Sequence, residues 1–166
     1  MFLVSLVFFG EEDMGFSFYI FRVVICFFAY VLVGCSAVVP LESMTKDLEA
    51  KEFAPVENKS QIYVVRPCDY GKLHDVSIDG GTRFSLACQN YIVFLTDPGT
   101  HRISAHSSEN RDVKNVITNG GKNYFVEMGW KMGSGTGDVR TSLSILNEAE
   151  GMKAVRESQL ISLSGY

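Results

Sequence analysis

The chain has 166 residues, a formal net charge of -4 and a slightly positive mean hydropathy of +0.10. This length suits one domain with one hydrophobic core, and two domains would be crowded. A charge balance this close to neutral gives no electrostatic reason to expect nucleic acid, whose phosphates attract basic patches, so we exclude that class of partner.

The apolar excess is concentrated in the first 34 residues. Arg22 precedes a run of twelve apolar or small residues from Val23 to Gly34, and this order of charge and apolar segment is typical of secretory signals. The run is shorter than the roughly 20 apolar residues that span a bilayer. The alternatives are an uncleaved membrane anchor and a buried core helix.

The segment Leu32-Val33-Gly34-Cys35 resembles the lipobox at which bacterial lipoproteins receive a diacylglyceryl group on the cysteine thiol. Removal of residues 1–34 as a signal peptide would leave 132 residues that begin at Cys35. Because an acidic cluster lies near the printed start, a true start at Met14 fits a signal better. The resemblance implies a lipid anchor, and the non-acidic Ser36 implies an outer membrane location facing the periplasm.

Residues 35–59 are expected to form the lipidated N-terminus and a tether. This segment contains Pro40 and Pro55, many charges and few large apolar residues, as spacers do. A short helix is the alternative, because three apolar residues have helical spacing: Leu41, Met44 and Leu48. The folded domain is expected over residues 60–162.

From Gln61 the chain changes to short runs rich in Val, Ile, Tyr and Phe, separated by Gly, Asn, Asp and Pro. This pattern predicts about eight β-strands. They are expected at 61–66, 75–78, 82–86, 90–96, 100–106, 113–118, 122–128 and 142–146. Met152 and Val155 have helical spacing and predict a short C-terminal helix over 148–159.

Three turns predict hairpins between successive strands: Asp79-Gly80-Gly81, Asp97-Pro98-Gly99 and Asn119-Gly120-Gly121. Gly80 and Gly99 accept the positive φ of a tight turn, and Pro98 presets φ for its turn. Hairpins with one apolar face each must pack sheet on sheet to bury those faces. The sequence therefore predicts an all-β protein, a small antiparallel β-sandwich, with a closed barrel as the alternative.

Four segments, in this order, resemble the bacterial family called domain of unknown function 2846: Tyr63-Val64-Val65-Arg66, Val76-Ser77-Ile78-Asp79-Gly80, Asp97-Pro98-Gly99-Thr100-His101 and Gly121-Lys122-Asn123-Tyr124-Phe125. The resemblance runs from about Ser60 to Ile161. It implies a small lipoprotein in which His101 forms a hydrogen bond beside its turn. It implies no enzymatic activity.

Cys68 and Cys88 are the two cysteines left to pair if Cys35 carries lipid. An oxidising periplasm favours a disulfide between them. The bridge would close a loop of about 20 residues and contribute roughly 3 kcal/mol on the loop-entropy model. Two separate thiols are the alternative.

The titratable and glycine-rich segments do not form a recognisable chemical motif. His101 and His106 are five residues apart on one expected strand and point to opposite faces, so we expect neither a metal site with His74 nor another cofactor. Residues 133–137 are rich in glycine, but no Gly-Lys-Ser/Thr follows them. We also find no nucleophile elbow or triad context.

Tyr70 and Trp130 are candidate residues of a binding surface, because amphipathic aromatic side chains suit saccharide or peptide contacts; core packing is the alternative. The leading functional hypothesis is a non-catalytic interaction module held on a membrane by its lipid. Its partner would be an envelope protein or glycan. The alternatives are an enzyme with an unrecognised site and an inhibitor of a hydrolase.

Overall fold

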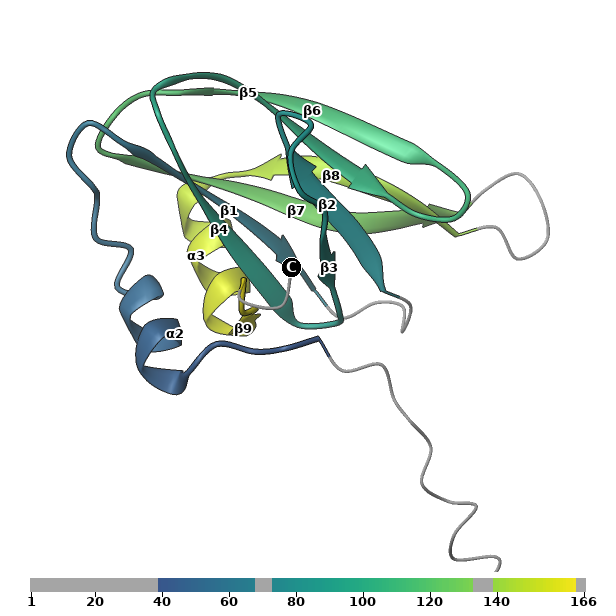
Figure 1. The fold of residues 1–166 in the computed structure, drawn as a ribbon, viewed down its shortest axis with the longest axis horizontal. Helices are drawn as coiled ribbons and strands as arrows, with labels where there is room; N and C mark the ends of the chain where they lie inside the picture. Colours follow the sequence, from purple (N-terminus) through teal and green to yellow (C-terminus); the bar gives the residue numbers. More distant parts are fainter. Residues whose placement is uncertain (1–38, 68–72, 133–138, 164–166) are drawn as a thin grey trace, which may run out of the picture. The chain divides into compact units, whose positions relative to one another are not determined.

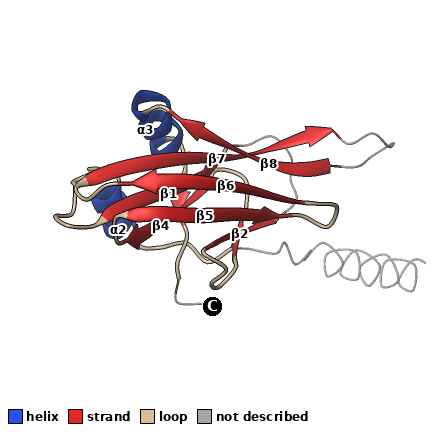
Figure 2. Cartoon of the chain, turned by 90° about the horizontal axis from the view of Figure 1, so that it is seen from above, coloured by secondary structure: helices blue, strands red, loops and turns tan. Residues whose placement is uncertain are grey.

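The computed structural model describes residues 39–67, 73–132 and 139–163 (Figure 1). The elements in these ranges are α2 (Met44–Ala50), β1 (Ser60–Arg66), β2 (His74–Ile78), β3 (Phe84–Leu86), β4 (Asn90–Thr96), β5 (Gly99–His106), β6 (Arg111–Thr118), β7 (Lys122–Met132), β8 (Val139–Leu146), α3 (Glu148–Arg156) and β9 (Gln159–Leu160). Figure 2 shows strands as the main component, with both helices toward the same end of the molecule.

The strands form two sheets, one of five strands in the order β8-β7-β1-β4-β9 and one of four in the order β3-β2-β5-β6. A single apolar core contains side chains from both sheets, including Ile62, Ile92, Val126 and Met128 from the first and Val76, Leu86 and Ile103 from the second. The predicted β-sandwich is therefore confirmed. The barrel alternative is wrong, because the strands divide into two separate sheets.

β1 lies at the centre of the five-stranded sheet and is buried on both faces. It pairs antiparallel with β4 and parallel with β7. Ile62 and Val64 point into the sandwich core, whereas Tyr63 and Val65 point to the outer face beneath the helices. A strand covered on both faces is expected to carry a continuous apolar run rather than an alternating one, as β1 does from Ile62 to Val65.

Two of the three predicted hairpins are wrong. β2 and β3 pair across the turn at 79–81, as expected. The turns at 97–99 and 119–121 instead carry the chain from one sheet to the other, so β4 does not pair with β5 nor β6 with β7. The other hairpins are β5 with β6 and β7 with β8. Turn residues predict that the chain reverses its direction. They do not predict which sheet the next strand joins.

The side chains of Asn110, just before β6, and of Asp112 in β6 join the two sheets along one side of the sandwich. The Asn110 amide donates to the carbonyl oxygen of Thr141 at 3.0 Å and accepts from the Thr141 backbone N–H at 2.8 Å. The Asp112 carboxylate accepts from the backbone N–H of Leu143 at 2.7 Å. These bonds satisfy backbone groups of β8 that would otherwise be exposed at an open sheet edge.

The chain is folded from Val39 onward, well before the expected start of the domain. Val39 is buried in the sandwich core, and Leu41 forms an antiparallel bridge with Ile161. The Ser43 side chain caps α2 by accepting from the Lys46 N–H, which confirms the alternative of a short helix. A spacer can therefore extend only over residues before Val39.

Candidate functional site

Aromatic side chains cover the outer face of the five-stranded sheet. The rings of Tyr63 and Phe125 are stacked with centroids 5.2 Å apart, and Phe53 approaches both rings at 5.4 and 5.8 Å. Tyr91 stacks on Tyr63 at 6.3 Å, and Val155 of α3 packs on this cluster. The outer face is therefore a second apolar layer that holds both helices.

Asp47 fixes α2 to this layer. Its carboxylate accepts from the Tyr91 hydroxyl at 3.0 Å, the Leu160 N–H at 2.8 Å and Lys51 Nζ at 2.6 Å. Burial raises the pKa of the Asp47 carboxyl, but these three donors outweigh burial and hold its pKa below the ordinary value. Burial, followed by the hydrogen bond to Asp47, raises the pKa of Tyr91.

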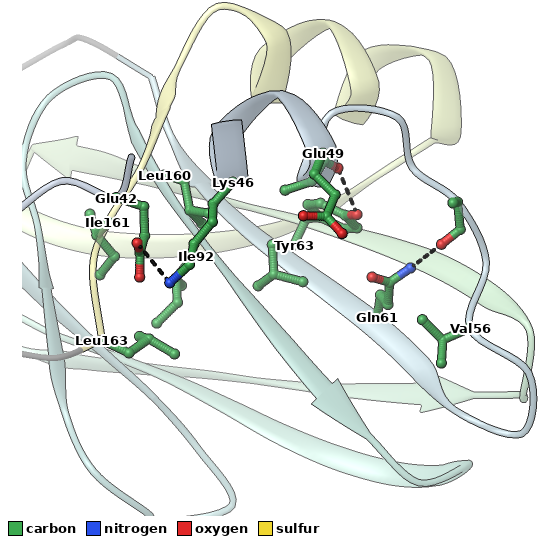
Figure 3. A pocket seen from close by; sticks show the side chains of 13 residues that line it. Glu42, Lys46, Glu49, Val56, Gln61, Tyr63, Ile92, Leu160, Ile161 and Leu163 are labelled. Atoms are coloured by element: carbon green, nitrogen blue, oxygen red, sulfur yellow. Dashed lines mark hydrogen bonds and ion pairs between the residues drawn. The ribbon is translucent and has the colours of Figure 1, made fainter. Parts of the chain in front are cut away.

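A groove of about 450 Å³ lies between α2, the segment after it and the outer face of β1 and β4 (Figure 3). Tyr63 lines its floor; the Tyr63 hydroxyl donates to the Ala50 carbonyl at 3.0 Å, and burial raises the pKa of Tyr63 to about 12. The lining is Glu42, Lys46, Glu49, Ala50, Ala54, Val56, Gln61, Tyr63, Ile92, Val93, Leu160, Ile161 and Leu163. The groove is therefore mainly apolar with a few polar groups.

Each end of the groove has an ordered polar pair. Lys46 Nζ lies 3.1 Å from a Glu42 carboxylate oxygen at one end. At the other end the Gln61 amide donates to the Ala54 carbonyl at 2.8 Å and to Asn123 Oδ1 at 2.9 Å. Apolar surface bounded by a few placed polar groups is the usual composition of a binding site.

The edge of β4 runs beside this groove. β9 pairs with β4 only at Asn90 and Tyr91, and the Ile161 N–H donates to the Tyr91 carbonyl at 3.0 Å. Backbone groups alternate in direction along a strand, so those of Val93 and Leu95 point the same way as those of Tyr91. Within the described ranges, strand pairing on this side ends at Tyr91, and Val93 and Leu95 present an open edge.

His101 joins two turns at one end of the sandwich. Its Nδ1 lies 2.7 Å from Asp79 Oδ2, and its Nε2 lies 2.7 Å from the Asp97 carbonyl oxygen. The same Asp79 carboxylate accepts from the Arg102 N–H at 2.7 Å, and Lys59 Nζ pairs with the Asp97 carboxylate at 2.7 Å. The hydrogen bond that the family resemblance implied for His101 is present.

Both ring nitrogens of His101 face acceptors, an arrangement that favours the doubly protonated imidazolium form of the ring. Burial lowers the pKa of His101, but the bonds to Asp79 and to the Asp97 carbonyl outweigh burial and raise it above its ordinary value. A ring with both nitrogens occupied has no lone pair with which to accept a proton from a nucleophile. In this state His101 holds the turns together and does not serve as a general base.

The remaining predicted site residues are dispersed. Gly80 has the expected positive φ of 76°, Pro98 lies in the connection between the sheets, and Gly99 is the first residue of β5 with a φ of 157°. Trp130 is half-buried on the core-facing side of β7 with Val126 and Met128, as strand alternation requires. Cys35, Tyr70 and the glycine-rich segment 133–137 lie outside the described residues.

Cys88 is half-buried in the turn between β3 and β4, and Cys68 lies outside the described residues. The disulfide between Cys68 and Cys88 therefore stays a prediction.

Within residues 39–67, 73–132 and 139–163, no three His, Cys, Asp or Glu side chains are close enough to hold a metal ion. In the same part of the chain, no helix has the length and apolar character needed to cross a bilayer.

Sequence reasoning missed the groove residues because none belongs to a chemical motif. A signal was present in β1, where the uninterrupted apolar run of Tyr63 to Val65 indicates a strand covered on both faces. The sequence around Asp47 does not indicate its role, because its hydrogen-bond partners Tyr91 and Leu160 are far away in the chain. Of the two aromatic candidates, Trp130 does not line the groove, and Tyr70 lies outside the described residues.

These features define a small two-sheet β-sandwich with two helices on one outer face and an apolar groove beside a strand edge. The chain belongs to the family described as Protein of unknown function (DUF2846), whose model matches residues 56–139. An uncharacterized protein of Haemophilus influenzae is 31% identical over 128 residues, which is 75% of each chain.

Proposed function

We propose that this protein is a lipid-anchored component of the bacterial cell envelope whose β-sandwich binds an extended segment of another envelope protein without catalysing a reaction. The observation that carries the proposal is the apolar groove beside the open edge of β4. The apolar leader that ends at Leu32-Val33-Gly34-Cys35 supports the anchor and an outer membrane location facing the periplasm.

An extended peptide has the shape and chemistry for this site. It would add to the sheet beside β4 through backbone hydrogen bonds to Val93 and Leu95. Its alternate side chains would point into the groove over Tyr63, because successive side chains leave a strand on opposite faces. Apolar side chains at those positions fit the groove lining. Backbone pairing would supply affinity, and the groove would supply specificity.

Photo-crosslinking in living cells tests the site. A photoreactive residue at Leu95, which is exposed beside the groove, should give a defined protein adduct. The matched control is Ile117, an exposed apolar residue on β6 of the other sheet. Adducts of equal yield at both positions, or none at Leu95, would overturn the proposal.

A backbone variant separates strand addition from simple apolar contact. Val93→Pro removes an N–H that points away from β1, and proline is tolerated on an edge strand when its missing N–H faces outward. We expect this variant to lose the adduct from Leu95. Val93→Thr keeps the N–H with a side chain of similar shape and should retain it. Equal adduct from both variants would contradict strand addition.

A further inference from the structure

We propose that the folded domain sits directly on the lipid bilayer, with the side chains of Leu41, Met44 and Leu48 against the lipid. We call these three residues the N-terminal apolar patch. This inference rests on the proposed anchoring at Cys35 and goes beyond it, because an anchored domain on a long spacer would not touch the membrane.

Only a short length of chain separates the proposed anchor from the folded domain. Three residues, 36–38, separate Cys35 from Val39, which is buried in the sandwich core. Four Cα-to-Cα steps span at most roughly 14 Å in a fully extended chain. A domain of this size has a radius of gyration of about 14 Å. The surface around Val39 therefore stays next to the membrane whichever way the domain tilts.

The surface near Val39 carries exposed apolar side chains. Leu41, Met44 and Leu48 are 44%, 80% and 59% exposed, and all follow Val39 within nine residues. Met44 and Leu48 are four residues apart on α2 and share one face. The bridge of Leu41 to Ile161 and the bonds of Asp47 hold the segment firmly on the sheet. Exposed apolar side chains on a rigid support beside a lipid anchor fit the boundary of headgroups and acyl chains.

The patch and the groove lie on different flanks of α2. Lys46 and Glu49 line the groove, and on a helix of 3.6 residues per turn they lie roughly 100–160° around the axis from Met44 and Leu48. Figure 1 shows α2 and the segment leading into it along one margin of the domain, below the strands. Contact between the patch and lipid therefore leaves the groove open to a partner.

Fluorescence quenching in vesicles tests the contact with lipid. The chain has one tryptophan, so Trp130→Phe gives a background in which Met44→Trp or Ile117→Trp is the only indole. Met44 is 80% and Ile117 is 73% exposed, which makes them a matched pair on different surfaces. Lipid-modified protein purified from membranes, with its mass verified at Cys35, is reconstituted in phosphatidylethanolamine and phosphatidylglycerol vesicles with and without brominated acyl chains.

We expect brominated lipid to reduce the emission of Met44→Trp and to leave that of Ile117→Trp unchanged. Protein that floats with the vesicles but shows no quenching at position 44, or equal quenching at both positions, overturns the inference and leaves the anchor intact. An unmodified Cys35 in the purified protein instead overturns the proposed anchor, so the two failures are distinguishable. Circular dichroism of each variant verifies that the sandwich is folded.

Discussion

Removal of the Asp47 carboxylate should detach α2 from the sheet and destabilise the domain. In Asp47→Ala, Lys51 loses its carboxylate partner, the Leu160 N–H loses its acceptor, and the Tyr91 hydroxyl keeps only the Asp47 carbonyl at 3.3 Å. A hydrogen bond that involves a charged group contributes about 1.5–3 kcal/mol, and a donor left without an acceptor costs about 1–3 kcal/mol. We therefore expect a loss of about 3 kcal/mol in the free energy of unfolding.

Urea denaturation followed by circular dichroism measures this loss. The matched control is Glu49→Ala on the same helix, where an exposed carboxylate is removed and the change should be within about 0.5 kcal/mol. Because the pKa of Asp47 is lowered in the folded state, its contribution is present above its ordinary value of 3.8 and is lost as the pH falls through the folded value. An equal free energy of unfolding for the two variants would refute the role of Asp47.

Three further predictions concern the sandwich. Gly151→Ala should destabilise the protein by about 1–3 kcal/mol, despite the higher helix propensity of alanine, because the new Cβ would overlap the Phe125 ring; a rise in the urea midpoint would contradict this. The raised pKa of His101 predicts a stability contribution that is complete below its ordinary value of 6.5 and is lost as the pH rises through the folded value. Thermal melts across this range should show less dependence on pH in His101→Gln, and identical profiles would exclude the effect. Thiol labelling should find Cys68 and Cys88 protected until a reductant is added, whereas immediate labelling of both would remove the disulfide.

The apolar runs and the glycine turns were sufficient to predict the fold class and eight of the nine strands in the described ranges, because the local pattern of these eight reflects burial on one or both faces. The two-residue strand β9 was not predicted, and Gln159 was expected in the C-terminal helix. Pairing was predictable only for β2 and β3, since the connections at Pro98 and Gly120 lead to the opposite sheet. A turn sequence specifies local backbone angles, whereas the choice of sheet depends on contacts between residues distant in the chain.

The groove could not be predicted from the sequence because it arises from tertiary contacts. The side of α2 that faces the sheet carries Asp47 and Lys51, which look like solvent-exposed charges in sequence. The apolar residues of the same segment, Met44 and Leu48, point outward instead. The larger apolar side chains of this helix are therefore exposed, and the helix is held on the sheet by the hydrogen bonds of Asp47 to Tyr91 and Leu160 and by the packing of Ala50 on the aromatic cluster.

The mass of the mature N-terminal peptide is the most direct test of the proposed anchoring. Protein extracted from membranes should give a peptide that begins at Cys35 and carries the mass of a diacylglyceryl group with a further acyl chain. An unmodified peptide that spans Gly34 and Cys35 would contradict both the removal of the leader and the attachment of lipid.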